Sequence, residues 1–361
     1  MRVLLLMRFL WIVGFVVILN PAHALDKDYH IAIDGTNLHF RVRGRSAANP
    51  YLLILHGGPG FSSFMFYPWG PALETKLNVV YLDQRGCGQS ARNTLSTNFK
   101  ATTTNAIKGY TISNMIKDIE GVRRFLKVKK WFVLGHSWGG MLGLEYILHS
   151  REHVLGFVDM DGVVSWPAMQ RSIVEQCRLR FIKMQHSGAA QNAQGTSLLR
   201  ILEHVAEQPL FSPTRMEAEF QLAMGPANLY FPAGQADAFA AFQTKIAAAV
   251  ATYHVPATAL YPAVLPALGL FQNDHLLTRD DTPLLGKVTI PTLIIEGKED
   301  GLITPAMAEI AHNKIKGSQL LELNNCGHFP FVSRPARTAL AVLQFVGEVE
   351  KHGFKEQRSA R

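Results

Sequence analysis

The chain has 361 residues, a formal net charge of +8 and 48% hydrophobic residues, which excludes an intrinsically disordered protein. This length fits one large α/β domain or two ordinary domains. The Lys and Arg residues form only short runs and no basic patch interleaved with aromatic residues. We therefore expect a solvated basic surface and no nucleic-acid partner.

The first 24 residues have the pattern of a secretory signal peptide. Arg2 and Arg8 precede an apolar run, residues 9–19, and Ala22-His23-Ala24 fits an A-x-A cleavage site. The run is short for a membrane span of about 20 residues, which favours a cleaved signal over an uncleaved anchor. We expect an exported chain, periplasmic or secreted, that begins at Leu25 and has no membrane association after signal removal.

The chain contains three widely spaced cysteines, Cys87, Cys177 and Cys326. Their spacing fits neither a disulfide framework nor a metal site. We expect free and mostly buried thiols. Because export leads to an oxidising compartment, a single disulfide between two of them is left open.

The pattern of apolar residues predicts an α/β fold. Alternation over residues 29–43 around Asp34-Gly35 predicts a β-hairpin. Continuous apolar runs at 51–55 and 78–82 predict buried strands, and helical spacing predicts a helix over 112–126. Further strands are predicted over 131–134, 155–160, 288–296 and 320–323. Apolar strands that alternate with helices indicate a mostly parallel sheet flanked by helices.

The pattern changes between about residues 165 and 285. Apolar residues there recur at helical spacing, interrupted by Gly, Ala and Pro stretches, without a buried-strand run. We predict a helical insertion that divides the core. The domain plan is a signal peptide (1–24), the first part of the core (25–164), a helical cap (165–285) and the second part of the core (286–361).

Residues 135–139, Gly-His-Ser-Trp-Gly, fit the pattern G-x-S-x-G between a predicted strand and a predicted helix. This is the context of a nucleophile elbow, in which a sharp turn exposes the serine hydroxyl. Gly135 and Gly139 lack the Cβ atom that would clash in such a turn. The N-terminus of the following helix favours developing negative charge. We predict that Ser137 is a catalytic nucleophile; a plain turn is the alternative.

A serine nucleophile needs a base, and the base needs an acid that orients it. One common chain order of the three is Ser, Asp or Glu, His. Asp300 follows a predicted buried strand and His328 follows the last predicted strand, so both fall at the carboxyl edge of the sheet with Ser137. We predict that these three residues form a catalytic triad.

Other residues near these strand ends offer the same chemistry. Asp161, Glu296 and Glu299 are alternatives for the acid. Of the 14 histidines, His136 adjoins the serine and His56 lies in a glycine-rich loop. We expect these two to have packing, hydrogen-bonding or structural roles.

Acyl transfer also needs hydrogen-bond donors for the tetrahedral oxyanion. The elbow supplies the backbone N–H of Trp138. The second donor is expected from the loop after an earlier strand, where residues 56–60 read His-Gly-Gly-Pro-Gly. We assign the Gly58 N–H, although a simple glycine-rich turn is the alternative reading.

Three motifs occur in order: His-Gly-Gly-Pro-Gly at 56–60, Asp-Gln-Arg-Gly-Cys-Gly-Gln-Ser at 83–90, and Gly-His-Ser-Trp-Gly-Gly at 135–140. With them the chain resembles the proline iminopeptidase branch of the α/β-hydrolase superfamily, over roughly residues 30–165 and 285–350. The resemblance implies an α/β-hydrolase fold with a helical cap and no metal or organic cofactor. It also implies the same triad and oxyanion donors, Ser137, Asp300, His328, Trp138 and Gly58.

Members of this branch remove N-terminal residues, often proline, from short peptides, and relatives cleave amides, esters and lactones. Proline iminopeptidases carry a Trp-x-x-Trp-Glu pattern whose acid, with another cap glutamate, holds the free amine of the substrate. The present cap has Trp166 at its edge and lacks that pattern. The cap glutamates are expected to be ordinary solvated charges: Glu203, Glu207, Glu217 and Glu219.

We therefore expect a serine hydrolase that acts through an acyl-enzyme on a small molecule or short peptide, as an aminopeptidase or amidase. A carboxylesterase or lactonase acting on small esters is the alternative. A non-enzymatic binding module with the same fold is the third reading. Such modules have typically lost a member of the triad.

Overall fold

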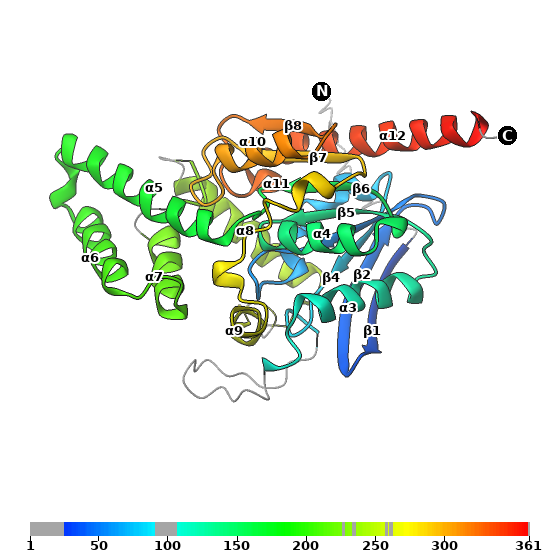
Figure 1. Cartoon of the computed structure of the whole chain (residues 1–361), viewed down its shortest axis with the longest axis horizontal. Helices are drawn as coiled ribbons and strands as arrows, with labels where there is room; N and C mark the ends of the chain where they lie inside the picture. The colour runs from blue at the N-terminus through cyan, green and yellow to red at the C-terminus, as the bar shows by residue number, and fades with distance from the viewer. Residues whose placement is uncertain are drawn as a thin grey trace, which may run out of the picture.

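The computed structural model describes residues 25–90, 107–225, 228–232, 236–256, 259 and 263–359. The predicted signal peptide lies outside the described residues, as do residues 91–106 of a polar stretch (91–110) whose composition predicts a loop. Within the described part of the chain, no helix is long and apolar enough to cross a membrane. Figure 1 shows a sheet flanked by helices, with a helical arm that projects away from it.

Within the described residues the sheet has eight strands, in the order β1-β2-β4-β3-β5-β6-β7-β8. The hairpin strands run antiparallel to each other, and β2 also runs antiparallel to β4. The remaining neighbours pair in parallel, which confirms the mostly parallel sheet. The strands are β1 (Leu25–Ile33), β2 (Thr36–Gly44), β3 (Tyr51–Leu55), β4 (Asn78–Leu82), β5 (Trp131–His136), β6 (Val154–Met160), β7 (Thr292–Gly297) and β8 (Gln319–Leu323).

The central strands are buried because both faces of the sheet are covered. On β5, Trp131 packs on Tyr146 of α4, whereas the next residue, Phe132, packs on Phe345 of α12. Since successive residues of a strand point to opposite faces, α4 and α12 lie on opposite faces of the sheet. The helices around the sheet are α1 (Gly70–Glu74), α3 (Ile112–Phe125), α4 (Trp138–His149), α10 (Pro305–Lys314), α11 (Pro330–Ser333) and α12 (Pro335–Ser359).

The strand predicted over 288–296 begins later than expected. β7 starts at Thr292, directly after Pro291. Proline has no N–H to donate to a neighbouring strand, so a central strand cannot run through it. The carbonyl oxygen of Pro291 still accepts the N–H of Phe157 at 2.9 Å, which sets the register of β7 against β6.

Five α-helices of the predicted insertion are described between β6 and β7. They are α5 (Trp166–His186), α6 (Ala193–Glu207), α7 (Pro213–Met224), α8 (Ala236–Thr252) and α9 (Val264–Asn273). Helices α5, α6 and α7 form the projecting arm in Figure 1. The chain enters and leaves the insertion side by side, since the Trp166 N–H donates to the Arg279 carbonyl at 2.9 Å and the Asp281 N–H to the Val164 carbonyl at 2.8 Å.

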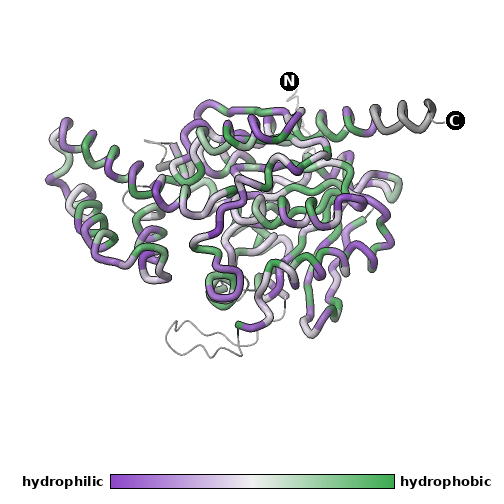
Figure 2. The backbone as a smooth tube through the Cα atoms, in the orientation of Figure 1, coloured by the Kyte–Doolittle hydropathy of each residue, from purple (hydrophilic) through white to green (hydrophobic). Residues whose placement is uncertain are grey.

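Figure 2 shows hydrophobic residues concentrated along the sheet and mixed colours along the outer helices. This is the expected pattern for a core shared by the sheet and one face of each helix. All three cysteines, Cys87, Cys177 and Cys326, are buried and free, as predicted.

Candidate functional site

Ser137 occupies a sharp turn between β5, which ends at His136, and α4, which begins at Trp138. Its backbone has φ 56° and ψ −122°, a conformation that residues with a side chain rarely adopt. A Cβ on Gly139 would collide with the backbone carbonyl of Leu55 on β3. Only glycine at that position lets the helix start so close to the sheet, and this is the turn that the G-x-S-x-G pattern predicts.

Asp300 and His328 come together at the ends of β7 and β8. Nδ1 of His328 lies 2.7 Å from Oδ2 of Asp300. The other oxygen of Asp300 accepts the backbone N–H groups of Leu302 and Ile303 at 2.7 and 3.2 Å. A carboxylate held at both oxygens fixes the imidazole with its proton on Nδ1, which leaves Nε2 as the basic nitrogen. The residues Ser137, Asp300 and His328 are 8%, 4% and 2% exposed.

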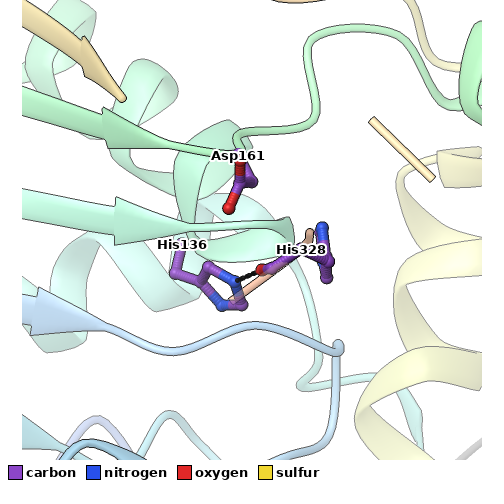
Figure 3. Close-up of side chains that lie close together, drawn as sticks. All are labelled: His136, Asp161 and His328. Atoms are coloured by element: carbon purple, nitrogen blue, oxygen red, sulfur yellow. Dashed lines mark hydrogen bonds between the residues drawn. The ribbon is translucent and has the colours of Figure 1, made fainter. Parts of the chain in front are cut away.

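The backbone of His328 is held by two distant segments. Its N–H donates to the carbonyl oxygen of Tyr230 in the helical insertion at 2.9 Å. Its carbonyl oxygen accepts the Nε2–H of His136 at 2.7 Å, and Figure 3 shows this bond as a dashed line. His136 is thus the hydrogen-bonding residue that the sequence indicated, and it joins the strand before Ser137 to the loop that carries the imidazole.

The loop after β3 lies beside the nucleophile. A Cβ on Gly57 would lie 3.1 Å from the Cβ of Ser137. Gly58 has φ 124°, which strongly favours glycine. Inside the loop, His56 donates from Nδ1 to the Gly57 carbonyl at 2.8 Å and accepts the Gln84 N–H at Nε2 at 3.2 Å. These contacts assign His56 the structural role expected for it.

Gln84 connects this loop to the elbow, a role that the sequence reading missed. Its Nε2 donates to the His56 carbonyl at 2.8 Å, and its Oε1 accepts the indole N–H of Trp138 at 2.9 Å. One side chain thus holds the loop that contains Gly58 against the residue that follows Ser137. The only sequence signal was a polar, glycine-rich turn directly after a buried strand.

Asp83, at the end of β4, anchors the same region. One carboxylate oxygen accepts Ser62 Oγ–H at 2.9 Å and both the N–H and the Oγ–H of Ser63 at 2.8 Å. The other accepts the Gln89 N–H and faces Nδ1 of His39, both at 2.8 Å. Burial alone would raise the pKa of Asp83, but the His39 hydrogen bond and charge and the Gln89 N–H lower it well below its usual value.

The structure gives the alternative acids different positions. Glu299 accepts the backbone N–H groups of Asn325 and Cys326 at 3.1 and 2.8 Å, so it supports the loop that precedes His328. Asp161 and Glu296 are buried, and one carboxyl oxygen of each lies within 4.8 Å of an oxygen of Asp300. Among the acids considered from the sequence, Asp300 is the one hydrogen-bonded to the His328 ring.

A second cluster includes both histidines of the site. One possible metal-ligand atom each of His136, Asp161 and His328 lies within 4.8 Å of the other two; Figure 3 shows these side chains. By distance alone these side chains could hold a metal ion. One ring nitrogen of each histidine, however, is already engaged, Nε2 of His136 by the His328 carbonyl and Nδ1 of His328 by Asp300.

The expectation of solvated cap glutamates is wrong for Glu219, whose side chain is fully buried. Oε1 accepts Arg215 Nε–H at 2.9 Å and Oε2 accepts Gln170 Nε2–H at 3.0 Å. Sequence spacing missed this burial because the inner face of α7 is defined only by its packing on α5. The remaining three glutamates are exposed: Glu203, Glu207 and Glu217.

Comparison with known proteins agrees with this architecture. Residues 50–335 match the protein family described as alpha/beta hydrolase fold. The proline iminopeptidase of Lactobacillus crispatus is 25% identical over 319 residues, which cover 83% of this chain and 91% of that protein. The proline iminopeptidase of Saccharolobus solfataricus is 25% identical over 332 residues, 88% of this chain and 91% of that protein.

Solved structures show the same fold. A proline iminopeptidase-related protein from Thermus thermophilus superposes with a TM-score of 0.66 at 20% sequence identity. The match covers 90% of this chain and 98% of that one. The solved structure thus shares the fold, and the two relatives named proline iminopeptidase match 83% and 88% of this chain.

Proposed function

Because the chain belongs to the alpha/beta hydrolase fold family it is a hydrolase, and we propose that it works through a triad of Ser137, His328 and Asp300. The observation that supports this most is the 2.7 Å contact between His328 Nδ1 and Asp300, whose second oxygen is held by two backbone N–H groups. Such a pair fixes the tautomer in which Nε2 can accept a proton from a serine hydroxyl.

In the proposed reaction, Ser137 Oγ attacks the carbonyl carbon of the substrate and His328 Nε2 takes the hydroxyl proton. Asp300 stabilises the imidazolium that forms. The imidazolium then gives the proton to the leaving amine or alkoxide, which produces an acyl-enzyme. Water, activated by the same imidazole, attacks the acyl carbon and releases the acid, so the enzyme returns to its starting protonation state.

The negative charge on the tetrahedral oxygen needs donors close to Ser137. We assign the N–H groups of Trp138, at the start of α4, and Gly58, in the loop that lies beside the serine. The N-terminus of α4 adds a favourable field because its first N–H groups have no partner inside the helix. Removing one such donor typically costs about 10²–10³ in kcat.

For the substrate, we favour a small amide or a short peptide cleaved at its N-terminus. The similarity to proteins named proline iminopeptidase supports this choice. A small ester or lactone is the second candidate, favoured by one observation. Both carboxylate oxygens of the buried cap residue Glu219 are already bound, by Arg215 and Gln170, so this side chain is not available to a substrate amine.

The deciding experiment is covalent labelling with a fluorophosphonate probe, followed by peptide mass spectrometry. We expect one adduct, on Ser137, and none in Ser137→Ala or after heat denaturation. Labelling at another residue, or failure of the native protein to label, would contradict the nucleophile assignment. Initial rates on proline-nitroanilide and on nitrophenyl butyrate then separate the amide from the ester reading.

A further inference from the structure

Three carboxyl groups cluster at the proposed active site, one of them the proposed triad member Asp300. One oxygen each of Asp161, Glu296 and Asp300 lies within 4.8 Å of the other two. They come from the ends of two neighbouring strands, β6 and β7. All three side chains are buried, Asp161 completely. Asp161 is also within 4.8 Å of a ring nitrogen of His328, so it lies near both members of the hydrogen-bonded pair.

In the described structure, few hydrogen-bond donors or positive charges offset the burial of Asp161 and Glu296. The Gly297 N–H donates to Oδ1 of Asp161 at 2.9 Å, whereas Oδ2 of Asp161 and Oε1 of Glu296 have no hydrogen-bond partner among the described residues. No described Lys or Arg forms an ion pair with either residue. The positive charge that the site can develop is that of His328, and Asp300 is its direct partner.

Electrostatics then decides which groups are ionised. Like charges a few ångströms apart in a buried site cannot all form. Burial raises the pKa of Asp161 well above its ordinary value, and the charge of Asp300 raises it further. Burial and the charge of Asp161 likewise raise the pKa of Glu296. Beside Asp300, both Asp161 and Glu296 are therefore shifted toward the protonated, neutral form.

We propose that Asp161 is a second orienting acid for His328, which takes over the contact to the imidazole when the carboxylate of Asp300 is removed. The proposal rests on the proposed function. Without Asp300, Asp161 releases its proton to solvent, and its carboxylate accepts the Nδ1–H of His328. Asp161 is thus a positioning residue that acts through the imidazole and does not itself touch the substrate.

The test is a double-mutant cycle on kcat/KM, with Ser137→Ala as the baseline. We expect Asp300→Ala to retain at least tenfold more activity than Ser137→Ala. Adding Asp161→Asn to Asp300→Ala should reduce the rate to that baseline. Asp161→Asn alone should cost less than tenfold, because Asp300 remains the main partner of the histidine. The amide of asparagine matches the neutral acid in shape, so the fold is retained.

Glu296→Gln in the Asp300→Ala background is the matched control, because it removes a neighbouring buried acid that does not belong to the histidine cluster. We expect it to change the residual rate by less than threefold. A pH profile separates orientation from packing. The residual activity of Asp300→Ala should rise with pH as Asp161 ionises, and this rise should be absent from Asp300→Ala/Asp161→Asn.

Two results would overturn the proposal. In one, Asp300→Ala/Asp161→Asn remains as active as Asp300→Ala; in the other, Asp300→Ala is no more active than Ser137→Ala. If the alanine variant does not fold, Asp300→Asn serves as the background. Substantial activity of Ser137→Ala in the otherwise native chain would instead refute the proposed function, so the two failures are distinguishable.

Discussion

Nε2 of His136 lies 2.7 Å from the backbone carbonyl oxygen of His328, although 192 positions separate the two residues in the chain. Burial and the neighbouring His328 lower the pKa of His136 well below its ordinary value, so the His136 ring is neutral at physiological pH. A neutral imidazole has one N–H, and the His328 carbonyl accepts it. The residue before the proposed nucleophile thereby fixes the loop of the proposed base.

His136→Phe keeps the aromatic packing against Phe66, Phe329 and Phe331 but removes this hydrogen bond. Because the carbonyl oxygen of His328 is then left buried and unpaired, we expect a loss of about 1–3 kcal/mol in the free energy of unfolding, measured in urea. Displacement of the loop should lower kcat by about tenfold or more. The control is His149→Ala on the exposed side of α4, and an unchanged kcat in His136→Phe would contradict this role.

Gln84→Leu removes both contacts that hold the loop of residues 56–60 to Trp138. Since this loop carries the proposed donor Gly58, we expect kcat to fall by about 10–100-fold while KM changes by less than threefold. Steady-state kinetics provide the measurement. Gln185→Ala on the exposed surface of α5 is the control. A change in KM alone would show that Gln84 supports substrate binding instead of the oxyanion donors.

His39 should make stability fall at alkaline pH. Burial alone would lower its pKa, but hydrogen bonds to Asp28 and Asp83 and the charges of both raise that pKa from 6.5 to about 9. Because protonated His39 is favoured in the folded state, its contribution to the free energy of unfolding is complete below pH 6.5 and is lost as the pH rises through 9. The partly exposed Asp28 is screened by solvent, so we expect a loss of no more than about 3 kcal/mol.

Urea unfolding at pH 6.5 and at pH 9.5 measures this contribution. In His39→Gln the difference between the two pH values should be smaller by most of that amount, since glutamine does not titrate. An equal pH dependence in both proteins would show that the His39–Asp83 contact contributes nothing to the pH profile of stability.

Two glycine substitutions should have opposite effects. Gly139→Ala places a methyl group against the Leu55 carbonyl, and we expect little soluble protein. Gly347→Ala in α12 meets nothing within 4 Å and should raise the free energy of unfolding by about 0.5–1 kcal/mol. Soluble expression and thermal melting compare the two. A well-folded Gly139→Ala protein would contradict the tight contact between β3 and α4.

Much of the fold followed from the sequence because buried strands have continuous apolar runs and helices have periodic ones. The strand ends also indicated where Asp300 and His328 would lie, because the carboxyl ends of parallel strands share one edge. The two side chains meet because β7 and β8, the strands that precede them, are parallel neighbours in the sheet.

Side-chain contacts between distant segments were not predictable in the same way. Gln84 hydrogen-bonds to His56 and to Trp138, which lie 28 and 54 positions away in the sequence. No local sequence pattern encodes such a pairing. Likewise, Glu219 looks like a surface charge in sequence, and its burial is defined only once α7 packs against α5. The contacts that support the site could therefore be identified only from the three-dimensional structure.

The backbone hydrogen bonds that close the insertion, between Trp166 and Arg279 and between Asp281 and Val164, have a practical consequence. A chain segment that leaves and rejoins its scaffold at one point can be excised and replaced without altering the path of the sheet. Chimeras that graft the cap of a relative between these two junctions would test what the cap contributes to substrate choice, provided that the graft supplies a backbone carbonyl in place of that of Tyr230, which accepts the His328 N–H.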